Sequence, residues 1–126
     1  MKATILFAHG ARNPDWAQPI LAIRDTMLAR EPSARVEAAF LEFISPLLPD
    51  AIDALVAEGF RDIVIVPIFM AQSGHTKRDL PALLDAARAR HADLSIAIAL
   101  PIGEAPAVVA AIAEYALSAS VPVSPV

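Results

Sequence analysis

Residues 63–81 read IVIVPIFMAQSGHTKRDLP, and this stretch decides the fold. It begins as an apolar, β-branched run, which predicts a strand buried on both of its faces. A polar loop with one histidine, His75, follows the strand, and a helical pattern begins at Leu80. Ligands of an open α/β sheet bind outside the carboxyl ends of the strands. We therefore expect chemistry in the loop around His75.

The same order of strand, loop and helix occurs four times along the chain. Right-handed crossovers between such units predict a three-layer α/β/α fold around a four-stranded parallel sheet, with strand order 2-1-3-4. The second strand is less hydrophobic than the others and is expected near an edge. Strands are expected at 2–8, 35–41, 62–68 and 95–100, and helices at about 16–30, 80–90 and 105–117, with another between Pro46 and Gly59.

Short polar side chains mark the expected starts of three helices. Asp15, Ser45 and Asp79 each precede a helical pattern and are predicted N-caps, and Pro46 suits the first helical position. The last helix is expected to pack inwards through an apolar face formed by Val108, Val109, Ile112 and Ala116. The sequence thus predicts one domain over 1–117, followed by a flexible Ser-, Pro- and Val-rich tail over 118–126.

Composition narrows the classes of function. The 126 residues match the commonest size of a single domain, and the net charge of −4 without a long basic run argues against nucleic acid as a partner. The chain has no cysteine, so any bound metal must use His, Asp or Glu. No apolar run approaches the ~20 residues that span a membrane. Met1 and Lys2 lead directly into a strand without a signal-peptide pattern, so a cytoplasmic protein is the expectation.

A second histidine, His9, follows the first strand as His75 follows the third. In the order 2-1-3-4 these strands are neighbours about 4.8 Å apart, so the two imidazoles could converge on one ion. Neutral imidazole suits Co²⁺, Ni²⁺, Fe²⁺ or Zn²⁺. The alternative is that each histidine is an ordinary loop residue bonded to backbone.

Glu42, at the end of the second strand, is a further candidate. It could complete a set of two histidines and one carboxylate, or accept protons from a substrate. Alternatively, it is a helix-terminal charge favoured by the dipole. Arg12, Lys77 and Arg78 could bind an anionic substrate, or they are ordinary solvated charges.

The remaining candidates are assigned structural roles at this point. Gly10 permits a tight turn or a close backbone approach. Trp16 is expected to pack at the start of the first helix, with a contact to a flat ligand as the alternative. His91 is expected at a helix C-terminus on the far side of the sheet, where it would compensate the dipole.

These motifs together resemble the class II tetrapyrrole chelatase family, in its small single-domain sirohydrochlorin form, the CbiX type. The resemblance covers essentially the whole chain in the family's motif order, and one departure is Ala11, where the family usually has serine. The matching segments are HGAR at 9–12, EFISP at 42–46, VPIFM at 66–70, GH at 74–75, DLP at 79–81 and PIG at 101–103.

The resemblance implies a chelatase fold, a homodimer, and insertion of a divalent metal into sirohydrochlorin during cobalamin or sirohaem-type biosynthesis. The metal is a substrate, most commonly Co²⁺ with Fe²⁺ or Ni²⁺ as alternatives, and no prosthetic group is expected. His9 and His75 match the metal ligands, and with Glu42 they form the implied catalytic set. The implied substrate-binding residues are Gly10, Arg12, Gly74, Lys77 and Arg78.

Two alternatives remain open. A non-catalytic metal- or tetrapyrrole-binding module would use the same histidines without turnover. A flavodoxin-like or phosphatase-like domain would bind phosphate through Arg12 and the first helix. This last reading is disfavoured, because the 4 glycines are isolated and form no phosphate loop.

Overall fold

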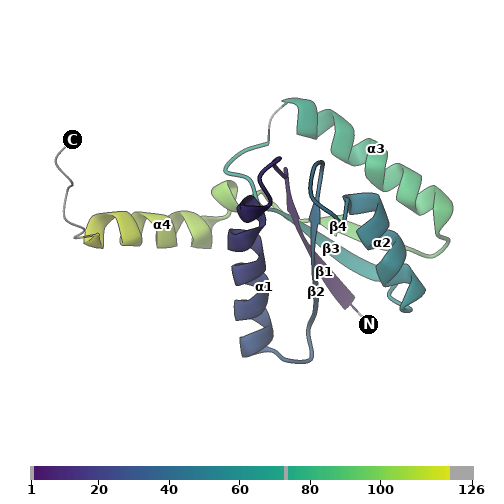
Figure 1. Cartoon of the computed structure of the whole chain (residues 1–126), viewed down its shortest axis with the longest axis horizontal. Coiled ribbons are helices and arrows are strands. Elements are labelled where there is room, and N and C mark those ends of the chain that lie inside the picture. Colours follow the sequence, from purple (N-terminus) through teal and green to yellow (C-terminus); the bar gives the residue numbers. More distant parts are fainter. Residues whose placement is uncertain (1, 73, 120–126) are drawn as a thin grey trace.

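The sheet has four parallel strands in the order β2-β1-β3-β4. The computed structural model describes residues 2–72 and 74–119. The strands are β1 (Lys2–Ala8), β2 (Arg35–Phe40), β3 (Asp62–Pro67) and β4 (Ser95–Ile98). The predicted strand order and the edge position of the second strand are both confirmed (Figure 1).

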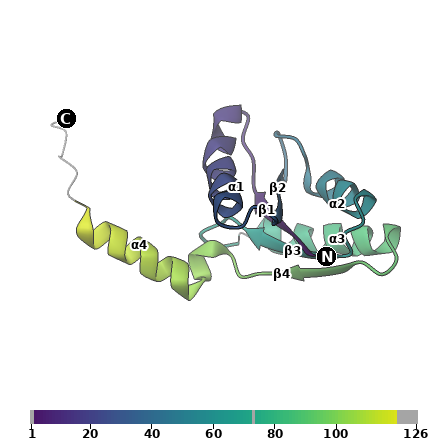
Figure 2. The same ribbon diagram turned by 90° about the horizontal axis from the view of Figure 1, so that it is seen from below.

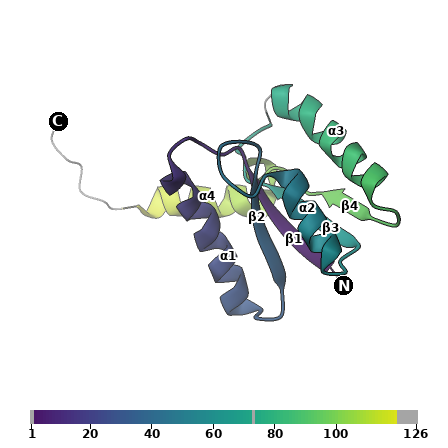
Figure 3. The ribbon, with the colours of Figure 1, turned by 45° about the vertical axis from the view of Figure 1, so that its right-hand side comes forward.

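Helices lie on both faces of this sheet. A 3₁₀ turn, η1 (Pro14–Ala17), leads into α1 (Gln18–Arg30) on one face, whereas α2 and α3 cover the other face (Figure 3). The other elements are α2 (Leu48–Ala57), α3 (Gly74–Arg90), the 3₁₀ turn η2 (Ile102–Glu104) and α4 (Pro106–Ser118).

Alternating side chains of the strands build two separate cores. Ile5, Phe7 and Ile65 are fully buried beneath α2 and α3. Leu6 and Phe40 point to the opposite face and pack under α1. This alternation follows from the two-residue period of a strand and explains why the strands read as continuous apolar runs.

The helix α3 begins earlier than predicted. It starts at Gly74 rather than at Leu80, so His75 belongs to its first turn, and the prediction that Asp79 caps the helix is wrong. Pro81 lies inside the helix although it cannot donate a backbone hydrogen bond. Burial explains the longer helix, because Thr76 (4% exposed) extends the buried face formed by Leu80, Leu84 and Ala87 by one turn towards the N-terminus of the helix.

Two other helix starts also differ from the prediction. Asn13, not Asp15, is the N-cap of η1, and its side chain accepts a hydrogen bond from the amide of Asp15 at 3.0 Å. The helix α2 begins at Leu48, so Ser45 does not cap it. The amide of Phe40 donates to the carbonyl of Pro46 at 2.9 Å, which keeps this segment extended beside β2 instead of helical.

The helix α4 departs most from the prediction. It projects away from the sheet, as Figure 2 shows, and contains no buried residue. The expectation that Val108, Val109, Ile112 and Ala116 pack inwards is therefore wrong for the single chain. Ser118 ends α4, close to the predicted helix end at about 117, and residues 120–126 of the predicted tail lie outside the described residues.

Without α4, the third layer is incomplete on the α1 side of the sheet. Val64 and Val66 on β3 are only partly buried on that side, and Ala97 on β4 is exposed. Their neighbours on β1 and β2, such as Leu6 and Val36, are buried by α1. An apolar half of one sheet face is thus left open beside α1.

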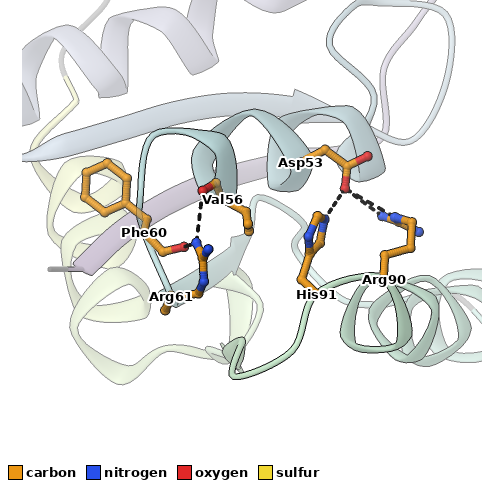
Figure 4. A network of polar contacts seen from close by, with 6 residues as sticks. All are labelled: Asp53, Val56, Phe60, Arg61, Arg90 and His91. Atoms are coloured by element: carbon orange, nitrogen blue, oxygen red, sulfur yellow. Dashed lines mark hydrogen bonds and ion pairs between the residues drawn. The ribbon is translucent and has the colours of Figure 1, made fainter.

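A polar network ties α2 to the end of α3 on the side away from the candidate site (Figure 4). His91 lies 2.6 Å from Asp53 through Nε2 and Oδ1, and Arg90 donates to the same oxygen at 3.1 Å. These bonds, first that of His91 and then that of Arg90, lower the pKa of the Asp53 carboxyl below its usual 3.8. His91 thus lies just after the C-terminus of α3, as predicted, and also contacts a specific partner, Asp53 on α2.

The lowered pKa of Asp53 predicts a contribution to acid stability. Because the folded-state pKa is depressed, the contribution is complete above about pH 4 and is lost as the pH falls through the lowered value. Asp53→Asn should therefore reduce the loss of unfolding free energy between pH 5 and pH 3, measured by urea titration. The control, Asp25→Asn on the exposed side of α1, should lose as much unfolding free energy over this pH range as the wild type. If Asp53→Asn also loses as much as the wild type, the lowered pKa of Asp53 does not contribute to acid stability.

Candidate functional site

The loops after β1 and β2 are held together by backbone hydrogen bonds that extend the sheet. The amide of Leu41 donates to the carbonyl of Ala8 at 3.0 Å, and that of Glu42 donates to the carbonyl of His9 at 3.2 Å. As a result, the Nε2 atom of His9 lies 3.7 Å from the Oε1 atom of Glu42. Both side chains are about half-exposed, at 52% and 48%, so the pair is open to a ligand.

The second ring nitrogen of His9 has a backbone partner. Its Nδ1 atom lies 3.2 Å from the carbonyl oxygen of Gly10, which can only accept, so Nδ1 carries the proton in this contact. With that proton on Nδ1, a neutral ring would present the lone pair of Nε2 towards Glu42. A lone pair beside a carboxylate oxygen is an arrangement that can hold a divalent cation or receive a proton.

Gly10 acts through its backbone. Its φ of +93° is left-handed, and a Cβ atom at this position would collide with the carbonyl oxygen of Glu42. The glycine therefore lets the two loops approach and sets the spacing of His9 and Glu42. Gly74 differs, because a Cβ atom there would meet nothing within 4 Å.

The loop after β3 joins the same edge of the sheet. The amide of Ile68 donates to the carbonyl of Phe7 at 2.8 Å, which continues the pairing of β1 with β3 beyond the strands. The backbone of His75 follows in the first turn of α3, and its side chain lies outside the described part of the structure. Among the described side chains no three metal-binding residues gather, so a shared ion for His9 and His75 stays a prediction.

The candidate cations lie on two elements near this edge. The guanidinium of Arg12 lies 5.3 Å from the ring centre of Phe43, an exposed side chain in the loop after β2. The sequence pattern predicts Lys77 and Arg78 in the loop before α3, but they are exposed on the first turns of this helix. Their positions keep an anion-binding role open, because the N-terminal end of a helix also favours negative charge.

A largely apolar cavity of about 440 Å³ adjoins His9. Its walls come from the loop after β1, from the start of α1 and from the end of β3. Trp16 lines the cavity and is 69% exposed, so the expectation that it packs at the start of the first helix is wrong. The lining residues are Ala8, His9, Gly10, Ala11, Trp16, Pro19, Ile20, Phe40, Ile68 and Phe69.

Solved structures place this arrangement in a known class. The CbiX protein of Marinobacter aquaeolei VT8 superposes with a TM-score of 0.80 at 25% identity, over 93% of this chain and 95% of that chain. The sirohydrochlorin chelatase SirB of Bacillus subtilis subspecies spizizenii, solved in complex with cobalt, gives a TM-score of 0.75 at 28% identity. That match covers 92% of this chain and 50% of SirB. The fold is thus that of the CbiX and SirB chelatases.

Sequence comparison gives the family. The model of the CbiX family matches residues 3–119, and this chain belongs to that family. The sirohydrochlorin cobaltochelatase of Methanococcus aeolicus is 36% identical over 84 residues, which make up 67% of this chain and 59% of that protein. The chain thus spans between half and three-fifths of the length of SirB and of this relative.

No described helix has the length and apolar character needed to cross a membrane.

Proposed function

We propose that this protein is a chelatase that inserts a divalent metal, foremost Co²⁺, into sirohydrochlorin. The observation that carries the proposal is the pair of His9 and Glu42, 3.7 Å apart and half-exposed, in which His9 lines a largely apolar cavity. Family membership supports it, because relatives in the CbiX family are named sirohydrochlorin cobaltochelatases and SirB was solved with cobalt.

Metal insertion requires that two pyrrole protons leave as the ion enters. In the proposed mechanism, His9 and His75 bind the incoming ion as substrate and displace its waters. Glu42, beside His9 and half-exposed, accepts the two pyrrole protons one after the other and passes each of them to solvent water. Arg12, Lys77 and Arg78 bind the carboxylates of the substrate and orient it above the strand ends.

The direct test is an anaerobic insertion assay with purified protein, sirohydrochlorin and one metal at a time. The expected result is loss of the absorbance of free sirohydrochlorin with Co²⁺, faster than in the absence of protein. Fe²⁺ and Ni²⁺ are offered in parallel, because imidazole binds all three ions and the sequence does not distinguish them. Binding of metal and macrocycle without turnover would instead identify a non-catalytic module.

We further propose that the active form is a homodimer in which α4 is covered by a second copy. A helix that is apolar almost all round is normally buried, and α4 carries a single charge, Glu114. Val109, Ile112, Tyr115 and Leu117 are nevertheless 48%, 43%, 71% and 90% exposed. The open half of the sheet face beside α1 offers an apolar surface of the kind such a helix needs. SirB, about twice as long as the matched region, is consistent with two such domains acting together.

The dimer proposal predicts the effect of a charge on α4. Ile112→Glu should convert the protein to a monomer, because burying an unpaired carboxylate in an apolar interface is unfavourable. Sedimentation equilibrium measures the result. The matched control, Ala29→Glu, adds the same charge at an exposed site of α1 and should remain dimeric. A wild-type monomer at all concentrations would refute the proposal.

A further inference from the structure

Trp16 is displayed to solvent by a well-ordered turn. The side chain of Asn13 caps η1 through the amide of Asp15, and the amide of Trp16 donates to the carbonyl of Asn13 at 3.2 Å. Pro14 occupies the first turn of η1, where its fixed φ favours this conformation. The turn therefore orders the backbone that carries the indole, and the side chain is 69% exposed. An exposed aromatic on an ordered turn beside an apolar cavity marks a binding surface.

The position of Trp16 relates it to the proposed chemistry. The indole and His9 line the same cavity of about 440 Å³, a volume in the range of small-molecule sites. Ile68 and Phe69, which directly follow β3, form another part of the cavity wall. Phe69 is fixed by an edge-to-face contact with Phe7, with ring centres 5.7 Å apart. The cavity thus combines a fixed apolar wall, an exposed flat indole and an imidazole.

We infer that Trp16 is a substrate-binding residue: its indole stacks on the flat macrocycle and positions the macrocycle over His9. This inference rests on the proposed function and adds a residue that the candidate set lacks. Stacking is favourable because it removes both the apolar face of the indole and the apolar face of the macrocycle from water. The cationic residues would then select the carboxylates of the substrate, and Trp16 would select its flat ring.

The test uses the full-length protein and compares Trp16→Ala with Trp16→Phe. The alanine variant should raise KM for sirohydrochlorin about tenfold with a smaller change in kcat, whereas phenylalanine should restore most of the affinity. Trp16 is the only tryptophan, so the wild type gives one indole N–H resonance in a ¹⁵N spectrum. Metal-free sirohydrochlorin should shift this resonance strongly, through the ring current of a stacked macrocycle. The control, Arg30→Ala at the far end of α1, should keep the wild-type KM.

The outcomes separate this inference from the proposed function. Normal turnover with an unchanged KM in Trp16→Ala would overturn the inference and leave the chelatase function intact. A shifted indole resonance without turnover would support the inference and overturn the function. If Trp16→Ala instead dissociates the dimer and leaves the KM unchanged, the residue belongs to the subunit interface and the inference is wrong.

Discussion

Replacing His9 with alanine is expected to lower the rate of metal insertion by about 100-fold or more. The change removes the ring nitrogen that lies 3.7 Å from the Glu42 carboxylate, and leaves one of the two predicted imidazole ligands for the ion. It should leave the fold intact, because the His9 side chain is half-exposed and its one backbone contact is local. Initial rates with Co²⁺ and sirohydrochlorin measure the effect, and a thermal unfolding curve confirms that the variant is folded.

His91→Ala is the matched control, since the chain has 3 histidines and this one lies outside the site. Its ring contacts Asp53 between α2 and the end of α3, so the variant should lose stability and keep its insertion rate at a temperature where it is folded. Full activity of the His9 variant would remove that side chain from the mechanism. His75→Ala, assayed in the same way, tests the other predicted ligand.

Gly10→Ala is expected to have the second large effect. A Cβ atom at this position meets the carbonyl oxygen of Glu42, and the φ of +93° is unfavourable for any L-residue. The two loops must then separate, which displaces Glu42 from His9. We expect a loss of at least ~2 kcal/mol in unfolding free energy, together with a large loss of insertion activity.

Gly59→Ala separates the cost of the positive φ from the effect of the collision with Glu42. Gly59 has a similar φ of +102°, but a Cβ atom there meets nothing within 4 Å. This variant should show only the cost of the backbone conformation, about 1–2 kcal/mol, with normal insertion at a temperature where it is folded. If Gly10→Ala loses no more stability and no more activity than Gly59→Ala, then contact between the loops does not set the site.

The sheet was predictable because its signals are local and repeated. Each strand is a short apolar run, and the right-handed rule leaves few orders for four such units. That order already brings the loops of His9, Glu42 and His75 to one edge of the sheet. The 3.7 Å contact of His9 with Glu42 was not predictable, because it depends on backbone bonds beyond the strand ends.

The errors also have physical causes. Pro81 suggested a late start for α3, but the buried face that includes Thr76 outweighs one lost hydrogen bond. The apolar face of α4 was assigned to its own sheet, since sequence shows that a face is apolar but not which surface covers it. Trp16 was expected to pack at the start of the first helix, whereas the turn capped by Asn13 leaves its side chain exposed.

Pro81 has a consequence for the proposed metal site. A proline at this position cannot donate to the carbonyl of Lys77, so one rung is missing between the first turns of α3 and the remainder of the helix. Packing holds the two sides of this gap in place, because Thr76 and Leu80 before it and Leu84 after it are all buried. The turn that carries His75, the predicted metal ligand, is therefore positioned by buried side chains rather than by an unbroken ladder of backbone hydrogen bonds.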